Sequence, residues 1–182
     1  MLEVEAKYRA ADWDAVRAKL AEWGAAADEA REDADHYFNA PDRDFAKTDE
    51  AVRLRRIGPA NFLTYKGPKR DPATKTRTEV ELPLADGAAV AATAVRLLTS
   101  LGYKPVAVVT KARQVYRLTR GGFELEVCLD DVGAVGRFVE LEIRAEEDRF
   151  EAAKRVLREA AAELGLTEQE RRSYLQLLLS QK

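Results

Sequence analysis

The 182-residue sequence is poor in sulfur and in histidine, and it has little excess of charge of either sign. Its one cysteine, Cys128, excludes an internal disulfide and is typical of a protein from a reducing compartment. Thirty Lys and Arg side chains against 32 Asp and Glu leave a formal net charge of −2. We therefore expect no global attraction for nucleic acid, and any phosphate binding must come from a local cluster of charges.

Signals for membranes and for secretion are also lacking. No run of about 18 apolar residues is present, which excludes a spanning helix. The first residues alternate between charged and apolar side chains, unlike the apolar core of a secretory signal. These absences predict one cytoplasmic domain over residues 1–182, without a membrane segment and without nucleic acid as a partner.

Two hydrophobic periods alternate along the chain. A period of two predicts seven strands, at residues 2–9, 51–57, 61–66, 75–84, 106–118, 123–129 and 138–144. Helical spacing predicts four helices, at residues 12–23, 86–101, 146–164 and 168–179. Segments 39–49, 67–74 and 131–136 are expected to be loops because Pro, Gly or Asp interrupts them.

One face of almost every predicted strand is ionic. Side chains two residues apart share a face, so Glu3, Glu5 and Lys7 lie together, opposite Leu2 and Val4. The same arrangement recurs at Arg53/Arg55, Arg77/Glu79/Glu81, Lys111/Arg113, Glu124/Glu126/Cys128/Asp130 and Glu140/Glu142/Arg144. An open sheet with one wet face would explain this pattern, and so would a closed barrel with an ionic interior.

The sorting of these charges favours a binding site. Some strands carry only cations (Arg53 and Arg55), and others carry mainly carboxylates (Glu3 and Glu5). Cations suit phosphate oxygens, and clustered carboxylates suit hard metal ions. The segments at residues 2–5, 78–81 and 139–142 each carry Glu-x-Glu or its equivalent and precede a helix, which indicates either a strand–helix unit used three times or a chance recurrence.

The opening Glu3-Val4-Glu5-Ala6-Lys7 resembles the ExExK motif of the CYTH superfamily, which includes class IV adenylate cyclases and thiamine triphosphatases. The resemblance continues in order through Asp35-His36-Tyr37-Phe38, Val52-Arg53-Leu54-Arg55, Thr64-Tyr65-Lys66-Gly67-Pro68, Arg77-Thr78-Glu79-Val80-Glu81, Thr110-Lys111-Ala112-Arg113, Leu129-Asp130-Asp131, Gly136-Arg137-Phe138-Val139-Glu140-Leu141-Glu142 and Arg172-Ser173-Tyr174. It covers nearly the whole chain.

This resemblance implies an α+β fold, an eight-stranded antiparallel β-barrel that forms a triphosphate tunnel, with helices packed outside. It implies two Mg²⁺ or Mn²⁺ ions held by acidic residues from a set that comprises Glu3, Glu5, Glu79, Glu81, Asp130, Glu140 and Glu142. It implies triphosphate binding by Lys7, Arg53, Arg55, Lys66, Arg77, Lys111 and Arg113. The catalytic set would be Glu5, Lys7, Arg113 and Glu140.

The resemblance leaves the reaction open. Our first hypothesis is a class IV adenylate cyclase that converts ATP to cyclic AMP and pyrophosphate. The alternatives are a tripolyphosphatase or thiamine triphosphatase, and a binder of nucleotide or polyphosphate without turnover. The basic segment 69–75 and the segment 42–50 are either solvated loops or lids, and the apolar last helix either folds back or pairs with a second copy as a homodimer.

Overall fold

The computed structural model describes residues 2–70 and 74–181. Its strands are β1 (Leu2–Arg9), β2 (Ala26–Ala27), β3 (Arg31–Asn39), β4 (Ala51–Ile57), β5 (Ala60–Lys69), β6 (Arg77–Leu84), β7 (Lys104–Arg120), β8 (Phe123–Asp131) and β9 (Arg137–Ala145). Its helices are α1 (Asp14–Glu22), α2 (Phe45–Thr48), α3 (Ala88–Ser100), α4 (Phe150–Glu163) and α5 (Tyr174–Leu179), with 3-10 turns η1 (Gly133–Val135) and η2 (Glu147–Arg149).

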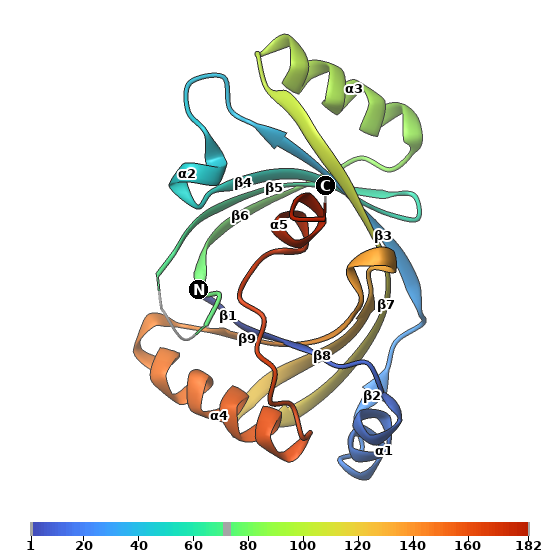
Figure 1. The fold of residues 1–182 in the computed structure, drawn as a ribbon, viewed down its shortest axis with the longest axis vertical. Helices are drawn as coiled ribbons and strands as arrows, with labels where there is room; N and C mark the ends of the chain where they lie inside the picture. The colour runs from blue at the N-terminus through green and yellow to red at the C-terminus, as the bar shows by residue number, and fades with distance from the viewer. Residues whose placement is uncertain (1, 71–73, 182) are drawn as a thin grey trace.

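Eight strands close into an antiparallel barrel in the order β7-β3-β4-β5-β6-β1-β9-β8, and β8 pairs back with β7. Figure 1 looks along this barrel, so the strands outline a ring. The short β2 pairs only with β7 and lies beside the ring. The closure confirms the predicted eight-stranded antiparallel barrel and decides against the open sheet. It also gives the ionic strand faces an enclosed interior.

Strands β1 and β6 share the shortest stretch of backbone pairing in the ring. Among the described residues, Glu3 and Arg77 are the one pair in register between them. Other segments continue the pairing along this edge of β1. The backbone N–H of Lys75 donates to the Glu5 carbonyl at 2.9 Å, and the N–H of Glu170 donates to the Lys7 carbonyl at 2.8 Å. Residues far apart in sequence therefore complete the wall beside β1.

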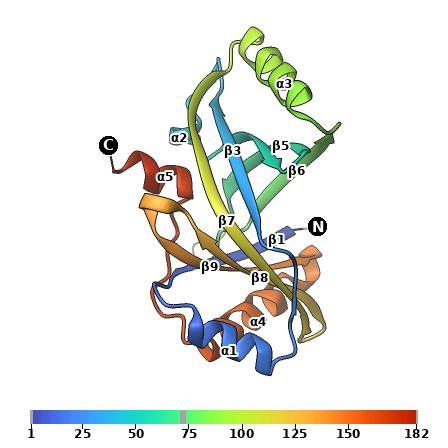
Figure 2. The ribbon, with the colours of Figure 1, turned by 90° about the vertical axis from the view of Figure 1, so that its right-hand side faces the viewer.

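Three helices cover the outside of the barrel because each presents an apolar stripe to the outward side chains of the strands. Helices α1 and α4 lie under β1, β8 and β9, and α3 lies at the opposite end of the molecule (Figure 2). The larger core joins helix residues to strand residues, among them Val16, Leu20, Val156, Leu157, Ala160, Val4, Leu125, Leu141 and Ile143.

Helix α5 differs from the three outer helices. It lies with α2 on one side of the barrel (Figure 2). Phe45 and Ala46 of α2 and Tyr174, Leu175, Gln176 and Leu179 of α5 line the interior cavity there, and we call this end the α2–α5 mouth. Tyr174 and Leu177 of α5 pack against Tyr37, Val109 and Phe138, which are interior residues of the barrel at this mouth. Of the two alternatives for the last helix, the structure shows that it folds back onto the barrel, and the homodimer stays a prediction.

Three sequence predictions need correction. β3 was not among the predicted strands because it carries Glu32, Asp33 and Asp35 and has little apolar alternation. The last helix begins at Tyr174, since residues 168–170 are extended along β1, with a bridge between Tyr8 and Gln169. The expected loop at 39–49 contains α2. Residues 67–69 of the expected loop at 67–74 belong to β5, and residues 71–73 lie outside the described residues.

The three predicted strand–helix units are present. β1 precedes α1, β6 precedes α3, and β9 precedes α4. The strands β6, β1 and β9 are also neighbours in the barrel. Among the helices of residues 2–70 and 74–181, none combines the length and the apolar character that crossing a membrane requires.

Candidate active site in the barrel interior

A cavity of about 380 Å³ fills the barrel interior. Twelve of the residues that the sequence nominates line it: Glu3, Glu5, Arg53, Arg55, Lys66, Arg77, Glu79, Glu81, Lys111, Arg113, Glu140 and Glu142. Two further nominees, Lys7 and Asp130, are fully buried behind this lining. The alternation of charged and apolar side chains therefore carries charged groups from separate strands into one space.

The charges divide the interior into two halves. Strands β7, β4 and β5 contribute Lys111, Arg113, Arg53, Arg55 and Lys66, whereas β6, β1 and β9 contribute Glu79, Glu81, Glu3, Glu5, Glu140 and Glu142. Each half also holds an opposite charge, Asp35 of β3 among the cations and Arg77 of β6 among the carboxylates. The strand order places the first group on one side of the ring and the second group on the other. An anionic ligand with a bound cation fits such an arrangement because its phosphate oxygens and its cation can face opposite walls.

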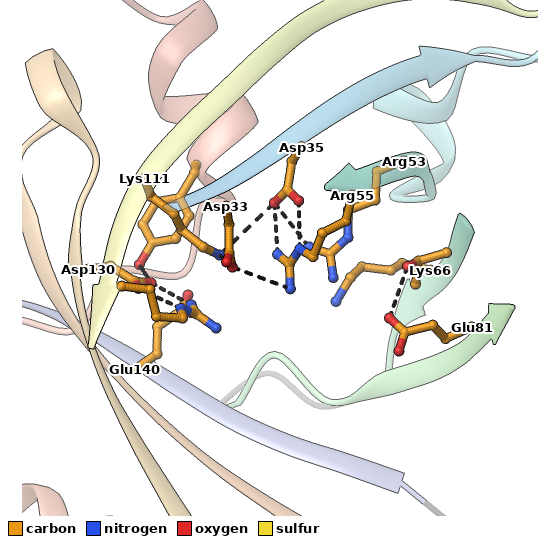
Figure 3. Close-up of polar contacts among 12 residues, drawn as sticks. Asp33, Asp35, Arg53, Arg55, Lys66, Glu81, Lys111, Asp130 and Glu140 are labelled. Carbon is orange, nitrogen blue, oxygen red and sulfur yellow. Dashed lines mark hydrogen bonds and ion pairs between the residues drawn. The ribbon is translucent and has the colours of Figure 1, made fainter. Parts of the chain in front are cut away.

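Asp35 of β3 organises the cationic half. Its carboxylate accepts two hydrogen bonds from Arg55, at 2.6 and 2.8 Å, and one from Arg53 at 3.3 Å (Figure 3). Burial by itself would raise the pKa of Asp35, but Arg53 and Arg55 outweigh it and hold the pKa far below its usual range. The register pairs Asp35 with Arg55, so backbone pairing sets this geometry.

The Arg53 side chain also has a buried hydrogen-bond donor that is not used by the described residues. Its Nε is buried and has no hydrogen-bond partner among the described residues. A buried donor without a partner is costly, and an anion in the cavity would satisfy it. This observation fits phosphate oxygens as the ligand of the cationic half.

Lys111 lies next to this cluster. Its Nζ is 3.6 Å from Asp33 Oδ2 and 4.0 Å from Asp35 Oδ2. Burial, followed by the charges of Arg113 and Arg55, lowers the pKa of Lys111 to about 8. An anionic ligand beside this ammonium would be favourable, because it would offset the burial of the charge and the repulsion from the cationic neighbours.

Arg113 connects the cationic wall to the carboxylates. It donates to Asp130 through Nε at 2.6 Å and to Glu140 Oε2 at 2.5 Å. The Tyr174 hydroxyl of α5 donates to Asp130 Oδ2 at 2.7 Å. Asp130 is thus engaged by Arg113 and Tyr174, and it orients Arg113 from behind the cavity wall.

Lys7 does not reach the cavity in this structure. Its Nζ donates to the Arg172 carbonyl at 2.6 Å and lies 3.9 Å from the centre of the Tyr174 ring. Burial, followed by the charge of Lys75, lowers the pKa of Lys7 to about 7. The predicted substrate contact of Lys7 stays a prediction, and the observed contact holds the C-terminal segment at the α2–α5 mouth.

Glu3 and Glu142 form a pair of like-charged groups on β1 and β9. Burial and the neighbouring Glu142 raise the pKa of Glu3 well above its usual value, and burial and Glu5 raise that of Glu142. This wall therefore carries more negative charge than its neighbours offset.

Lys75 compensates a second carboxylate pair. Its Nζ contacts Glu5 Oε1 and lies 3.5 Å from Glu140 Oε1. Burial by itself would lower the pKa of Lys75, but Glu5 and Glu140 outweigh it and raise the pKa above its ordinary value. Lys66 of the cationic half pairs with Glu79 of β6 and lies 3.8 Å from Glu3.

The donor set suits a divalent cation in its chemistry. Glu3, Glu5, Glu140 and Glu142 supply hard oxygen atoms from the paired strands β1 and β9. The raised pKa values of Glu3 and Glu142 indicate negative charge that a cation would relieve. Within residues 2–70 and 74–181, no three acidic side chains converge as metal ligands. Lys75 lies between Glu5 and Glu140.

Three interior residues were not assigned roles from the sequence. Asp35 was visible as part of a motif, but its partners on β4 depend on the barrel register. Tyr174 also lay in a motif, and its contact with Asp130 joins residues 44 positions apart. Lys75 was grouped with an exposed basic loop, whereas the structure buries it. In each case the missing information was a contact between distant segments.

Fold and interior together define a class of protein, a closed eight-stranded antiparallel barrel with cations and carboxylates on opposite interior walls. Comparison with known proteins gives the family within this class. The profile of the CYTH domain matches residues 1–174. The chain therefore belongs to the CYTH family.

Several proteins of known sequence or structure are similar to this chain. The chain is 37% identical to a candidate adenylate cyclase of Methanocaldococcus jannaschii over 142 residues, 78% of this chain and 77% of that protein. It is 31% identical to the adenylate cyclase CyaB of Aeromonas hydrophila, over 94% of this chain and 86% of that protein. The structure of PH1819 from Pyrococcus horikoshii matches with a TM-score of 0.87 and 38% identity over 99% of both chains.

A more distant structure shows the same fold. HpAC1 of Hippeastrum, described as a candidate adenylyl cyclase with a dominant triphosphatase activity, matches with a TM-score of 0.71 at 17% identity. The match covers 100% of this chain and 96% of that chain. At this identity the likeness concerns the barrel alone.

Proposed function

We propose that the protein is a divalent-metal-dependent enzyme that converts ATP to cyclic AMP and pyrophosphate, like a class IV adenylate cyclase. The observation that carries this proposal is the division of one closed cavity into a cationic and a carboxylate wall. CYTH proteins generally depend on metal, and the two curated relatives bear adenylate cyclase names. A cytoplasmic location and a small-molecule triphosphate as the partner belong to the same proposal.

The residues divide the work by charge. Arg53, Arg55, Lys66, Arg77, Lys111 and Arg113 would hold the phosphate oxygens, with the arginines making bidentate contacts. Glu3, Glu5, Glu140 and Glu142 would hold Mg²⁺ or Mn²⁺, with Glu79, Glu81 and Asp130 as further acidic groups. Bound metal would supply activation of the nucleophile and charge neutralisation on the leaving phosphate.

Phosphoryl and nucleotidyl transfer require little covalent help from the protein. Alignment of the attacking and leaving oxygens and neutralisation of charge provide most of the catalysis. Arg113 is suited to this task because Asp130 and Glu140 fix its guanidinium from two sides. An aligned guanidinium needs no rearrangement when charge develops on the phosphate.

The α2–α5 mouth favours a nucleotide over an inorganic triphosphate. The cavity lining there includes Val106, Leu175 and Leu179 together with Phe45 of α2. Val106 and Leu179 are 39% and 41% exposed, so both side chains are accessible to a ligand at this mouth. This apolar wall next to the cationic half would receive the base and sugar of ATP.

Hydrolysis of a triphosphate is the second candidate function. The same charged interior would serve a tripolyphosphatase or a thiamine triphosphatase, in which water attacks the terminal phosphorus. The triphosphatase activity described for HpAC1 is a property of that protein and motivates the alternative here. A binder without turnover is the third candidate.

One assay separates these functions. The purified protein is incubated with ATP, tripolyphosphate or thiamine triphosphate, each with Mg²⁺ and with Mn²⁺, and cyclic AMP, pyrophosphate and phosphate are quantified. We expect cyclic AMP and pyrophosphate in equal amounts from ATP. Absence of cyclic AMP under every condition would refute the cyclase, phosphate release would establish the hydrolase, and metal-dependent binding without product would establish the binder.

A further inference from the structure

Lys75 occupies the space between two carboxylates that are nominated to bind metal. Its ammonium contacts Glu5 and lies 3.5 Å from Glu140, and the side chain is buried. Glu5 belongs to β1 and Glu140 to β9, and these strands pair directly. The ammonium therefore bridges two neighbouring strands at the carboxylate wall.

The four nominated metal carboxylates all have a cation beside them. Glu5 and Glu140 share the Lys75 ammonium, whereas Lys66 lies 3.8 Å from Glu3 and Arg144 lies 3.6 Å from Glu142. Each contact places a positive charge beside oxygens that would bind a divalent cation. Unpaired buried carboxylates would be costly, so the metal-free protein needs such substitutes.

The Lys75 backbone is fixed while its side chain has room to move. The backbone N–H donates to the Glu5 carbonyl at 2.9 Å, and the neighbouring Thr76 carbonyl accepts from the Arg70 N–H at 2.8 Å. The side chain lines the 380 Å³ cavity and has four methylene groups between backbone and ammonium. Rotation of that stem can carry the ammonium away from Glu5 without a change in the wall.

We propose that Lys75 is a built-in cation that competes with the divalent metal for Glu5 and Glu140. Metal binding displaces the ammonium into the cavity, where phosphate oxygens of the substrate meet it. The ion pair then stabilises the metal-free protein and weakens metal binding until metal and triphosphate arrive together. This inference rests on the proposed metal site of the enzyme and adds to it a positioning residue outside the nominated motif residues.

Other interior lysines do not share this arrangement. Lys66 pairs with Glu79 at the edge of the carboxylate wall, and Lys111 lies beside Asp33 on the cationic half. Lys7 is held by the Arg172 carbonyl. Lys75 is the lysine that the described residues place between Glu5 and Glu140.

The test measures metal affinity without turnover. Mn²⁺ is titrated into wild-type protein and into K75M, and free Mn²⁺ is followed by electron paramagnetic resonance. We expect K75M to bind Mn²⁺ about tenfold more tightly, because removing the ammonium releases both carboxylates and ends the repulsion of a second cation. Equal or weaker Mn²⁺ binding by folded K75M would overturn the proposal.

K69M is the matched control. Lys69 lies in the same part of the chain and loses the same charge on substitution, but its partner is Asp49. We expect the Mn²⁺ affinity of K69M to stay within about twofold of wild type. Lys69 does not contact Glu5 or Glu140 in the described structure, so salt screens most of its effect on them. A gain in K69M equal to that in K75M would assign the effect to net charge and overturn the proposal.

A measurement on the wild-type protein covers the case in which K75M does not fold. Acetylation of lysines by an amine-reactive reagent is quantified by mass spectrometry with and without saturating Mg²⁺. We expect Lys75 to react several-fold faster with Mg²⁺, whereas Lys111 keeps its rate. Unchanged protection of Lys75 in protein that binds Mg²⁺ would refute the displacement, whereas failure of both wild type and K75M to bind either metal would refute the metal site itself.

Discussion

At the residue scale, the interior carboxylates fall into two groups with different expected roles. Asp35 and Asp130 are engaged by arginines and hold those arginines in place. Glu3, Glu5, Glu140 and Glu142 lie on the carboxylate wall, where like charges gather. Substitution in the first group should affect folding and orientation, and substitution in the second group should affect metal binding.

Glu5→Gln and Glu140→Gln test the second role. Each change keeps the shape of the side chain but removes a charged metal ligand. We expect kcat to fall at least about 100-fold in each variant, since charge stabilisation in the transition state would be lost. Rates of cyclic AMP formation with Mg²⁺ and with Mn²⁺ measure this effect, with circular dichroism as the control for folding. Near-normal rates in both variants would contradict the assignment.

Lys7 should make stability depend on pH. Its pKa is about 7 in the folded protein against an ordinary value of 10.5, so between these values the unfolded chain binds a proton that the folded protein lacks. The contribution of Lys7 to the free energy of unfolding should therefore increase by about 1 kcal/mol per pH unit as the pH rises above 7.

Denaturant unfolding of wild type and K7M measures this contribution. We choose a range of about pH 6 to pH 9 because the pKa of Lys7 in the folded protein is about 7. The difference between the two proteins isolates Lys7 from other titrating groups, and the exposed Lys104→Met serves as the control. A difference that does not change with pH would show that Lys7 stays charged in the folded protein.

At the scale of elements, β3 determines how the cationic half is assembled. Its register pairs Asp35 with Arg55, and β4 turns Arg53 toward the same carboxylate. The strand has few apolar residues because its interior face compensates two cationic neighbours, β4 and β7. A strand of this kind is specified by its partners more than by its own hydrophobic pattern.

Asp35→Asn should lower the free energy of unfolding and should increase the stabilisation that an anionic ligand gives. Removing the buried carboxylate leaves Arg53 and Arg55 uncompensated, with an expected loss of about 3 kcal/mol in the free energy of unfolding. Tripolyphosphate should recover part of this loss because its oxygens replace the carboxylate. Denaturant unfolding with and without tripolyphosphate measures both effects.

Asp42→Asn is the control for the loss of one negative charge. Asp42 forms an exposed ion pair with Arg43, so its substitution should cost less than about 1 kcal/mol. A cost for Asp35→Asn as small as that for Asp42→Asn would show that the buried cluster contributes little. No recovery by tripolyphosphate would argue against phosphate binding at Arg53 and Arg55.

At the scale of the whole molecule, like charges repel one another on each of the two interior walls. A metal–triphosphate complex would reduce this repulsion on both walls. Tripolyphosphate with Mg²⁺ at about 100 times its Kd should stabilise the fold by about 2.7 kcal/mol, which corresponds to a rise in Tm of about 5 °C or more for a chain of this length. Thermal unfolding measures the shift. Sodium sulfate at equal ionic strength is the control, and an equal shift with sulfate would indicate a general salt effect.

Much of the architecture was determined by the sequence alone. The period of two along β1 and β9 assigned Glu3, Glu5, Glu140 and Glu142 to one face and the apolar residues to the other. Helical spacing located α1, α3 and α4 to within a few residues. These patterns are local, because a strand or helix repeats over a few residues and exposes its faces through that repeat.

The tertiary structure decided what the interior charges touch. A period of two says which face a side chain occupies, but it does not say which strand lies across the barrel. The contact between Lys75 and Glu5 spans 70 positions, and that between Lys7 and Arg172 spans 165. Closure of β7 onto β8 brings such distant groups into one interior space with little access to water, where burial and neighbouring charge fix their pairing and their pKa values.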